Sequence, residues 1–290
     1  TATLEFMPAP FLTLKLEARA DYSTAPVFGT PAIHEDGTTV GTQLVKDINP
    51  GSYSSMYGYY STPGLAVVAG KLHFAADDGT TGSELWTSDG TTAGTTLTKD
   101  INTRNRGSNP YQLTDLSGTL FFNANGDTSS FWKSDGTSAG TVSAEDILAG
   151  TGASDPQDVV NVNGTLYFSA RNGANGRELW KSNGTAAGTK FIKDILPGIY
   201  GSNPRGFTSV GGTVYFSADD GAGEELWKTD GTTAGTQLVK LINPASYYHI
   251  SEITAVGSTL FFSADDGTSG RELWKSDGST AGTVLVKDIR

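Results

Sequence analysis

Short runs of apolar and β-branched residues alternate with glycine-rich turns along the chain. Residues 206–242 contain the runs FTSV, TVYFSA, ELWKT and TQLVKLI, which are separated by VGG, DDGAGE and DGTTAG. Runs of this length, bounded by such turn signals, predict β-strands joined by hairpins. No helical periodicity interrupts them, so the segment predicts four antiparallel strands.

One phrase recurs at a regular interval. It reads LWTSDGTTAGT at 85–95, FWKSDGTSAGT at 131–141, LWKSNGTAAGT at 179–189, LWKTDGTTAGT at 226–236 and LWKSDGSTAGT at 273–283. A degenerate copy, AIHEDGTTVGT, lies at 32–42. Repeats of about 40–50 residues that hold four short strands each are typical of the blades of a β-propeller.

We therefore predict an all-β, six-bladed β-propeller with four antiparallel strands per blade and a degenerate first blade, in which Ile33 replaces the tryptophan. Residues 1–290 are predicted to form a single domain, with residues 1–8 as an N-terminal extension or an edge strand. The last repeat ends with its own fourth strand, so no strand is shared between the first and last blades. The predicted blades are 9–48, 49–101, 102–147, 148–195, 196–242 and 243–290.

The repeated motif is interpreted as structural. Asp-Gly predicts a tight hairpin between the third and fourth strands, because glycine accepts a positive φ and Asp or Asn tolerates one. Asn183 replaces the aspartate in one copy, which keeps the turn chemistry and removes the charge. Tryptophans recur at blade spacing and are predicted to pack between neighbouring blades. They are Trp86, Trp132, Trp180, Trp227 and Trp274.

The copies ELWKSNGTAAGT at 178–189 and ELWKSDGSTAGT at 272–283 resemble the ELWxxDGT repeat of bacterial extracellular and surface proteins. The resemblance covers about residues 30–290, with the tryptophan kept in five copies and the Gly-Thr end in all six. It implies a propeller fold and an extracellular or cell-surface location, and it implies no particular reaction. The chain begins at Thr1 without a signal-peptide pattern, which favours a mature or trimmed form.

Candidate binding residues gather in the predicted connections between blades. In a four-stranded blade these connections share one end of the molecule with the loops between strands two and three. Of eleven tyrosines, eight fall in these connections, whereas the phenylalanines lie mostly on strands. Tyrosine and arginine are typical of recognition surfaces. The predicted ligand-binding residues are Tyr53, Tyr57, Tyr59, Tyr60, Arg104, Arg106, Tyr111, Tyr200, Arg205, Tyr247, Tyr248 and His249.

Composition excludes several classes of function. A net charge of −11 and a pI near 4.7 argue against a nucleic-acid binder and against docking on anionic lipid. The absence of cysteine excludes disulfides, thiolate metal sites and a cysteine nucleophile. No apolar run approaches the roughly 18 residues of a membrane span.

Adjacent acids occur in the predicted loops between strands two and three. Paired carboxylates beside a glycine turn can bind Ca²⁺ when other oxygens complete the coordination, although the spacing is not that of an EF-hand. The alternative is that these residues cap solvated turns. No cofactor is required by either interpretation. The candidate metal ligands are Asp77, Asp78, Asp219, Asp220, Asp265 and Asp266.

Three functions remain open. The first is a non-catalytic extracellular module that binds a neutral or acidic glycan, or a cell-surface partner, through the tyrosine- and arginine-bearing loops. The second is a polysaccharide lyase, in which His249 or a nearby tyrosine abstracts a proton and Arg205 or Arg106 neutralises the uronate carboxylate. The third is a building block that self-associates through residues 1–8 or blade edges. We favour binding and assign no catalytic residue.

Overall fold

The computed structural model describes residues 43–56, 64–104, 107–126, 131–144, 153–244 and 250–289. These residues form five four-stranded antiparallel sheets. In this part of the chain no helix is long and apolar enough to cross a membrane. The strands are β1 (Leu65–Val68), β2 (Lys71–Asp77), β3 (Ser83–Ser88), β4 (Thr96–Lys99), β5 (Tyr111–Leu116), β6 (Thr119–Asn123), β7 (Phe131–Ser134), β8 (Val142–Ser143), β9 (Ala153–Val162), β10 (Thr165–Asn172), β11 (Arg177–Ser182), β12 (Lys190–Lys193), β13 (Arg205–Val210), β14 (Thr213–Asp219), β15 (Glu224–Thr229), β16 (Gln237–Lys240), β17 (Ser251–Val256), β18 (Thr259–Asp265), β19 (Arg271–Ser276) and β20 (Val284–Lys287).

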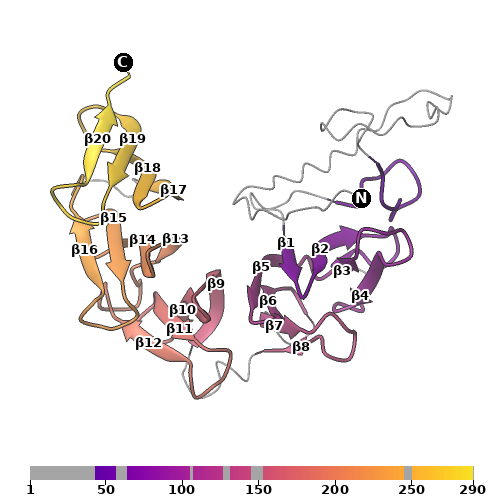
Figure 1. The fold of residues 1–290 in the computed structure, drawn as a ribbon. Helices are drawn as coiled ribbons and strands as arrows, with labels where there is room; N and C mark the ends of the chain where they lie inside the picture. The colour runs from indigo at the N-terminus through magenta and orange to yellow at the C-terminus, as the bar shows by residue number, and fades with distance from the viewer. Residues whose placement is uncertain are drawn as a thin grey trace, which may run out of the picture.

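Each sheet pairs its strands in chain order, as expected of a propeller blade. The first strand of each blade contacts the first strand of the next, from β1 through β5, β9 and β13 to β17. The five blades follow one another around an arc, with β1–β4 at one end and β17–β20 at the other (Figure 1). For the five described blades, the prediction of all-β structure with four antiparallel strands each is confirmed. The predicted first blade lies outside the described residues, apart from residues 43–48, and the predicted extension 1–8 lies wholly outside them.

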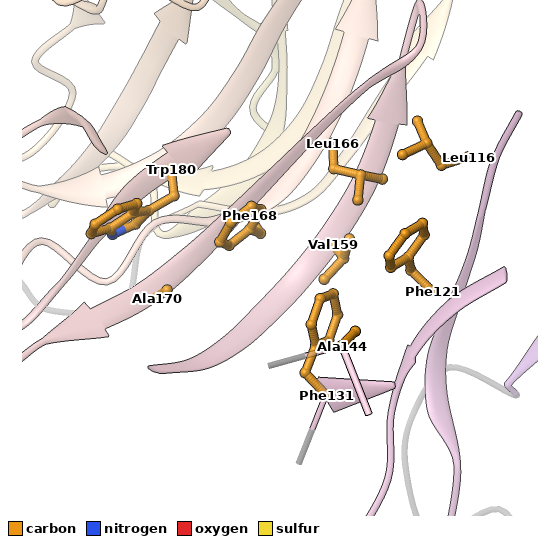
Figure 2. Close-up of a cluster of buried hydrophobic side chains, with 9 residues drawn as sticks. All are labelled: Leu116, Phe121, Phe131, Ala144, Val159, Leu166, Phe168, Ala170 and Trp180. Atoms are coloured by element: carbon orange, nitrogen blue, oxygen red, sulfur yellow. The ribbon is translucent and has the colours of Figure 1, made fainter. Parts of the chain in front are cut away.

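The hydrophobic core lies between neighbouring blades. Phe121 and Phe131 of one blade form a cluster with Leu166, Phe168 and Trp180 of the next (Figure 2). Alternate residues of a strand point to opposite faces of its sheet, so each inner blade presents one apolar row to each neighbour. The blades are therefore held to one another by the same burial that stabilises each sheet.

The motif tryptophans pack against the preceding blade, as predicted. Trp227 on β15 packs with Leu179 and Ile192 of the blade before it, and the Lys193 ammonium lies 5.7 Å from its ring centroid. Trp274 repeats this arrangement with Lys240 at 5.9 Å. An ammonium at this distance over an aromatic face is attracted by the ring quadrupole. The apolar anchor and its cation thus recur together at the blade interface.

The Asp-Gly segment is not the tight hairpin that the sequence predicted. Strand β15 ends at Thr229 and β16 begins at Gln237, so the connection is a longer closed loop. Asp230 Oδ1 accepts hydrogen bonds from the backbone N–H and the hydroxyl of Thr232, and Thr232 Oγ1 accepts one from the N–H of Gly235. A Cβ at Gly235 would lie 2.0 Å from Asp230 Oδ1, so a larger residue there would displace the capping carboxylate.

The structural interpretation of the motif is confirmed by its amide copy. Asn183 Oδ1 accepts the same pair of hydrogen bonds from the backbone and the hydroxyl of Thr185. A neutral oxygen performs this task as well as a carboxylate, because only acceptor geometry is needed. The motif is therefore a capped loop.

Candidate functional site

A buried glutamate shapes the connection that follows each of several blades. Glu178, on β11, accepts hydrogen bonds at one end of the next connection from the N–H groups of Ile195 (3.0 Å) and Leu196 (3.2 Å). At the other end it accepts from the N–H (2.7 Å) and hydroxyl (2.5 Å) of Ser202. One carboxylate thus closes the loop 195–202 at both ends. We call this arrangement the glutamate clamp.

The clamp recurs in other blades. Glu84 accepts hydrogen bonds from Ile101, Asn102 and Ser108, and Glu225 accepts from the N–H groups of Ile242 and Asn243. This explains why the predicted strand at 236–242 ends early, at Lys240. Residues beyond it give their N–H groups to the clamp instead of the sheet.

Burial raises the pKa of Glu178 above its ordinary value, and the hydrogen bonds from Ser202, Ile195 and Leu196 act in the opposite direction. The same balance, with burial as the largest cause, raises the pKa of Glu84. A buried carboxylate is stable in the fold when several donors compensate for its desolvation. The donors here are supplied by the loop, so loop shape and glutamate burial depend on each other.

The inter-blade loops display apolar and aromatic side chains to solvent. Ile199 and Tyr200, in the loop closed by Glu178, are 71% and 81% exposed. Tyr53 is 75% exposed and precedes Ser55, whose carbonyl accepts a hydrogen bond from the N–H of Asp77 at the loop between β2 and β3. The N–H of Asp219, at the corresponding place at the end of β14, likewise donates to the carbonyl of Ser202. These bonds place the inter-blade loops and the loops between strands two and three at one end of the molecule.

The structure places only some of the other predicted binding residues in exposed loops. Arg104 is exposed in the loop that Glu84 closes. Tyr111 and Arg205 are the first residues of strands β5 and β13, so they are not in loops as predicted, and Tyr111 is half-buried. The rest lie outside the described residues, and their roles stay predictions. They are Tyr57, Tyr59, Tyr60, Arg106, Tyr247, Tyr248 and His249.

Charged side chains on the first and third strands of a blade form ion pairs near the same end. The Arg205 guanidinium forms a two-point pair with Glu224, in which Nε donates to Oε1 at 2.8 Å and a second nitrogen bonds to Oε2. Arg177 is buried and pairs with Asp155. A planar guanidinium forms such paired bonds with a carboxylate readily. The fork of Arg205, predicted to face a ligand, is thus engaged by an acid of its own blade.

Pairwise contacts also link the innermost strands. Gln112 on β5 donates through Nε2 to Asp158 on β9 at 3.1 Å, and Asp158 also accepts from the N–H of Gly206 on β13. Burial raises the pKa of Asp158, while the charges of Arg205 and Arg177 act to lower it. Sequence reasoning did not find Gln112 or Asp158, since nothing in their local pattern marks them.

These residues occupy equivalent places in their blades. Gln112, Asp158, Gly206 and Glu252 all have positive φ, between 54° and 67°, on first strands. The register of β5, β13 and β17 shifts just beside them. Such bulges re-aim side chains on a strand.

The hollows among the described residues include the following two. One of about 300 Å³ runs along the innermost strands and is lined by Gln112, Asp158, Val159, Gly206 and Phe207 among others. A larger one, of about 450 Å³, lies at the opposite end beneath the motif loops of two blades, beside Asp135 and Asn183. The larger hollow is therefore remote from the exposed tyrosines.

The paired aspartates cap the loops between strands two and three. Asp78 Oδ1 accepts hydrogen bonds from the N–H and hydroxyl groups of Thr80 and Thr81. Asp266 makes the equivalent bonds with Thr268 and Ser269, and Asp77, Asp219, Asp220 and Asp265 each accept a backbone N–H two residues on. In the described ranges no three His, Asp or Glu side chains gather as metal ligands. Calcium binding at these loops stays a prediction.

This capping predicts a loss of stability in acid. Burial opposes ionisation of Asp78, but the bonds from Thr81 and Thr80 outweigh it and lower its pKa from 3.8 to about 2. The bonds from Ser269 and Thr268 lower that of Asp266 from 3.8 to about 2. The ionised forms therefore stabilise the fold above pH 3.8, and that stability is lost as the pH falls to about 2.

We expect the melting temperature to fall over this window, and to fall less in the double variant Asp78→Asn with Asp266→Asn, which keeps an acceptor oxygen but cannot titrate. Thermal unfolding at stepped pH measures the effect. An equal dependence of melting temperature on pH in the wild-type protein and the double variant would contradict this prediction. The pKa values of Glu84 and Glu178 are raised, so these carboxyl groups titrate at a higher pH than Asp78 and Asp266. Their titration does not produce the fall in melting temperature between pH 3.8 and about 2.

No protein-family model and no curated protein sequence matches the chain. Among solved structures, the GH74 xyloglucanase from Xanthomonas campestris is 18% identical, with a TM-score of 0.51 over 77% of this chain and 38% of that chain. A puromycin hydrolase mutant in complex with PGG is 12% identical, with a TM-score of 0.51 over 77% and 37%. A chain of the nidogen/laminin complex is 14% identical over 77% and 79%, with a TM-score of 0.45.

The chain spans well under half the length of the two enzymes that it matches. At this level of identity the likeness concerns fold alone. Together with the five consecutive four-stranded sheets, it shows that this chain has a β-propeller fold with repeated blades.

Proposed function

We propose that the chain is a non-catalytic extracellular binding module that recognises a glycan, or a glycan-bearing surface partner, through its clamped loop end. The observation that carries the proposal is the placement of Tyr200. Its side chain is 81% exposed on a loop that Glu178 closes at both ends. An aromatic ring held out on an ordered loop loses little conformational freedom when it meets a flat ligand.

Sugar chemistry fits this display. The less polar face of a pyranose ring stacks on an aromatic ring, and the tyrosine hydroxyl supplies a donor and an acceptor at its edge. Ile199, 71% exposed beside Tyr200, extends the apolar platform. Arg205 is paired with Glu224, so stacking supports the proposal more strongly than recognition of acidic groups. That pairing also removes support from a lyase that uses Arg205 against a uronate.

We further propose that the first repeat supplies a sixth blade, which would make the chain a six-bladed propeller of the ELWxxDGT type. Lys46 donates through Nζ to the carbonyl of Thr95 at 2.6 Å and lies 5.7 Å from the ring of Trp86. Lys193 makes the same bond to Thr236 in a later blade, at 2.8 Å. Residues 43–48 therefore contact the next blade in the way that fourth strands do.

The glycan proposal predicts that Tyr200→Ala weakens binding at least about tenfold without a change in melting temperature, since the residue is 81% exposed in the free protein. The wild-type chain is screened on an array of neutral and uronate-containing oligosaccharides, with and without Ca²⁺. The strongest hit is then titrated by calorimetry against both proteins.

The matched control is Val256→Ala. Val256 is 60% exposed and precedes the turn between β17 and β18, at the end opposite the clamped loops. The Val256→Ala substitution should leave the affinity for the oligosaccharide unchanged. A wild-type chain that binds no oligosaccharide on the array, or a Tyr200→Ala variant that binds as well as wild type, would overturn the proposal. Release of unsaturated products, seen by ultraviolet absorption, would indicate the lyase instead.

A further inference from the structure

The last blade exposes a face that earlier blades bury. Leu85, Leu179 and Leu226 occupy the same motif position on β3, β11 and β15, and each is fully buried. Leu273, at that position on β19, is 44% exposed. The difference arises because the earlier leucines are covered by the tryptophan of the following blade, as Leu226 is by Trp274.

The fourth strand and the residues after it are also more exposed in the last blade than in earlier blades. Val239 on β16 is 3% exposed, whereas Val286, its equivalent on β20, is 43% exposed. Ile195 is 6% exposed, whereas Ile289, its equivalent after the last blade, is 72% exposed. Three repeat positions that pack against a following blade elsewhere are therefore left open on β17–β20. A contiguous apolar face of this kind favours a partner surface.

Blade interfaces also carry two side-chain hydrogen bonds that recur. Thr280 Oγ1 donates to the carbonyl of Val239 at 2.7 Å, as Thr233 does to Ile192 at 2.6 Å. In the opposite direction, Lys240 Nζ donates to the carbonyl of Thr283 at 2.7 Å. These bonds join the motif loop of one blade to the fourth strand of the blade before it.

The first repeat contains the residues that these bonds need. In AIHEDGTTVGT, Thr39 and Thr42 stand where Thr280 and Thr283 stand in the last copy. Lys287 on β20 stands where Lys240 stands on β16, and it is exposed. Ile33 occupies the place of the tryptophan that covers the leucine in other interfaces. The sequence therefore offers counterparts for the two recurring bonds and for the cover of Leu273.

We infer that the motif loop of the first repeat, residues 32–42, docks on the exposed face of β17–β20 and closes the ring without exchange of a strand. This inference rests on the sixth blade proposed above. Thr39 Oγ1 donates to the carbonyl of Val286, Lys287 Nζ donates to the carbonyl of Thr42, and Ile33 covers Leu273. Closure is then a sixth copy of the ordinary blade interface.

The occupant is this chain's own first repeat because of where residues 43–48 lie. They already contact β1–β4 through Lys46, and Thr92 Oγ1 donates to the carbonyl of Val45 at 2.6 Å. The described blades form an open arc, so a blade added beyond β1–β4 would extend the arc in the direction of β17–β20 (Figure 1). Tethering also favours an intramolecular contact over one with a second molecule at ordinary concentrations.

Paired cysteines test the contact, since the natural chain has none. The test pair is Thr39→Cys with Val286→Cys. The matched control is Thr280→Cys with Val239→Cys, which replaces an equivalent pair joined by an observed hydrogen bond. Both proteins are oxidised in dilute solution and, in parallel, treated with a short bismaleimide that tolerates looser geometry. Non-reducing gels and intact mass then separate intramolecular from intermolecular links.

We expect an intramolecular cross-link in the test pair, at a yield within about twofold of the control pair, because the two contacts have the same geometry. Cross-linked dimers would show that a second copy covers the face, and would overturn the inference. So would a test pair that links by neither reagent while the control pair links. Neither result depends on a ligand, so this experiment does not test the glycan proposal.

Discussion

Replacing Glu178 with alanine is expected to lower the free energy of unfolding by about 3–5 kcal/mol, since it leaves buried donors without their charged acceptor. Four hydrogen bonds are lost at once, from Ile195, Leu196 and the two donors of Ser202. The loop 195–202 is also released at both ends, so its amide hydrogens should exchange faster. Urea unfolding and hydrogen exchange measure the two effects.

Two further variants show whether the loss of stability comes from the hydrogen bonds of Glu178. Asp47→Ala removes an exposed acid and should change stability by no more than about 0.5 kcal/mol. Glu178→Gln keeps one acceptor oxygen but turns an NH₂ group toward backbone donors, so it should lie between wild type and alanine. If Glu178→Ala unfolds at the wild-type urea concentration, the glutamate clamp does not hold the loop.

The clamp connects stability with the proposed function. If the loop must be ordered to present Tyr200, Glu178→Ala should also weaken oligosaccharide binding under conditions in which the sheets stay folded. The same glutamate recurs as Glu84 and Glu225, so one scaffold element can support loops of different sequence. Loops that vary on a rigid frame are typical of recognition surfaces.

Replacing Trp227 with alanine is expected to lower the free energy of unfolding by about 3–5 kcal/mol, because it opens a cavity between two blades. The ring is 6% exposed and packs against Leu179, Ile192 and Ile195 of the preceding blade. The stacked ammonium of Lys193 loses its aromatic face as well. Calorimetric unfolding, with tertiary structure followed by near-ultraviolet circular dichroism, measures the change.

Trp132→Ala is the matched control. Trp132 holds the same motif position on β7 but is only half-buried against Leu85 and Ile101, so its loss should cost less. Equal costs for the two variants would contradict the view that burial between blades sets the contribution of each tryptophan. The Nε1 atoms of Trp86, Trp180, Trp227 and Trp274 are buried without a hydrogen-bond partner among the described residues, so the rings contribute through packing and not through a donated bond.

The repeated pattern predicted most of the fold because each blade is built from local signals. Apolar runs, glycine turns and the period of the motif are all readable within one repeat, and Asn183 shows even in sequence that the motif needs an acceptor more than a charge. The same local signals also led to one wrong prediction within the repeat. Asp-Gly predicts a tight hairpin, but hydrogen bonds from Thr232 to Asp230 close a wider loop.

The candidate site was predicted only in outline. Chain direction alone put the variable connections at one end, and composition marked Tyr53 and Tyr200, both of which are exposed there. Arg205 was also marked, but its partner Glu224 was not foreseen, because the pair spans two strands of a sheet whose register has a bulge. The contact of Gln112 with Asp158 joins two different blades and has no local signature.

The sequence by itself determined the strands, their grouping into blades and the chemistry of the motif loops, since these depend on neighbours along the chain. Only the tertiary structure decided what the buried glutamates do, which arginines are matched and which face of the last blade is open. Those properties depend on groups that folding brings together from separate strands and separate blades, where burial changes the energy of a charge and of an apolar side chain alike.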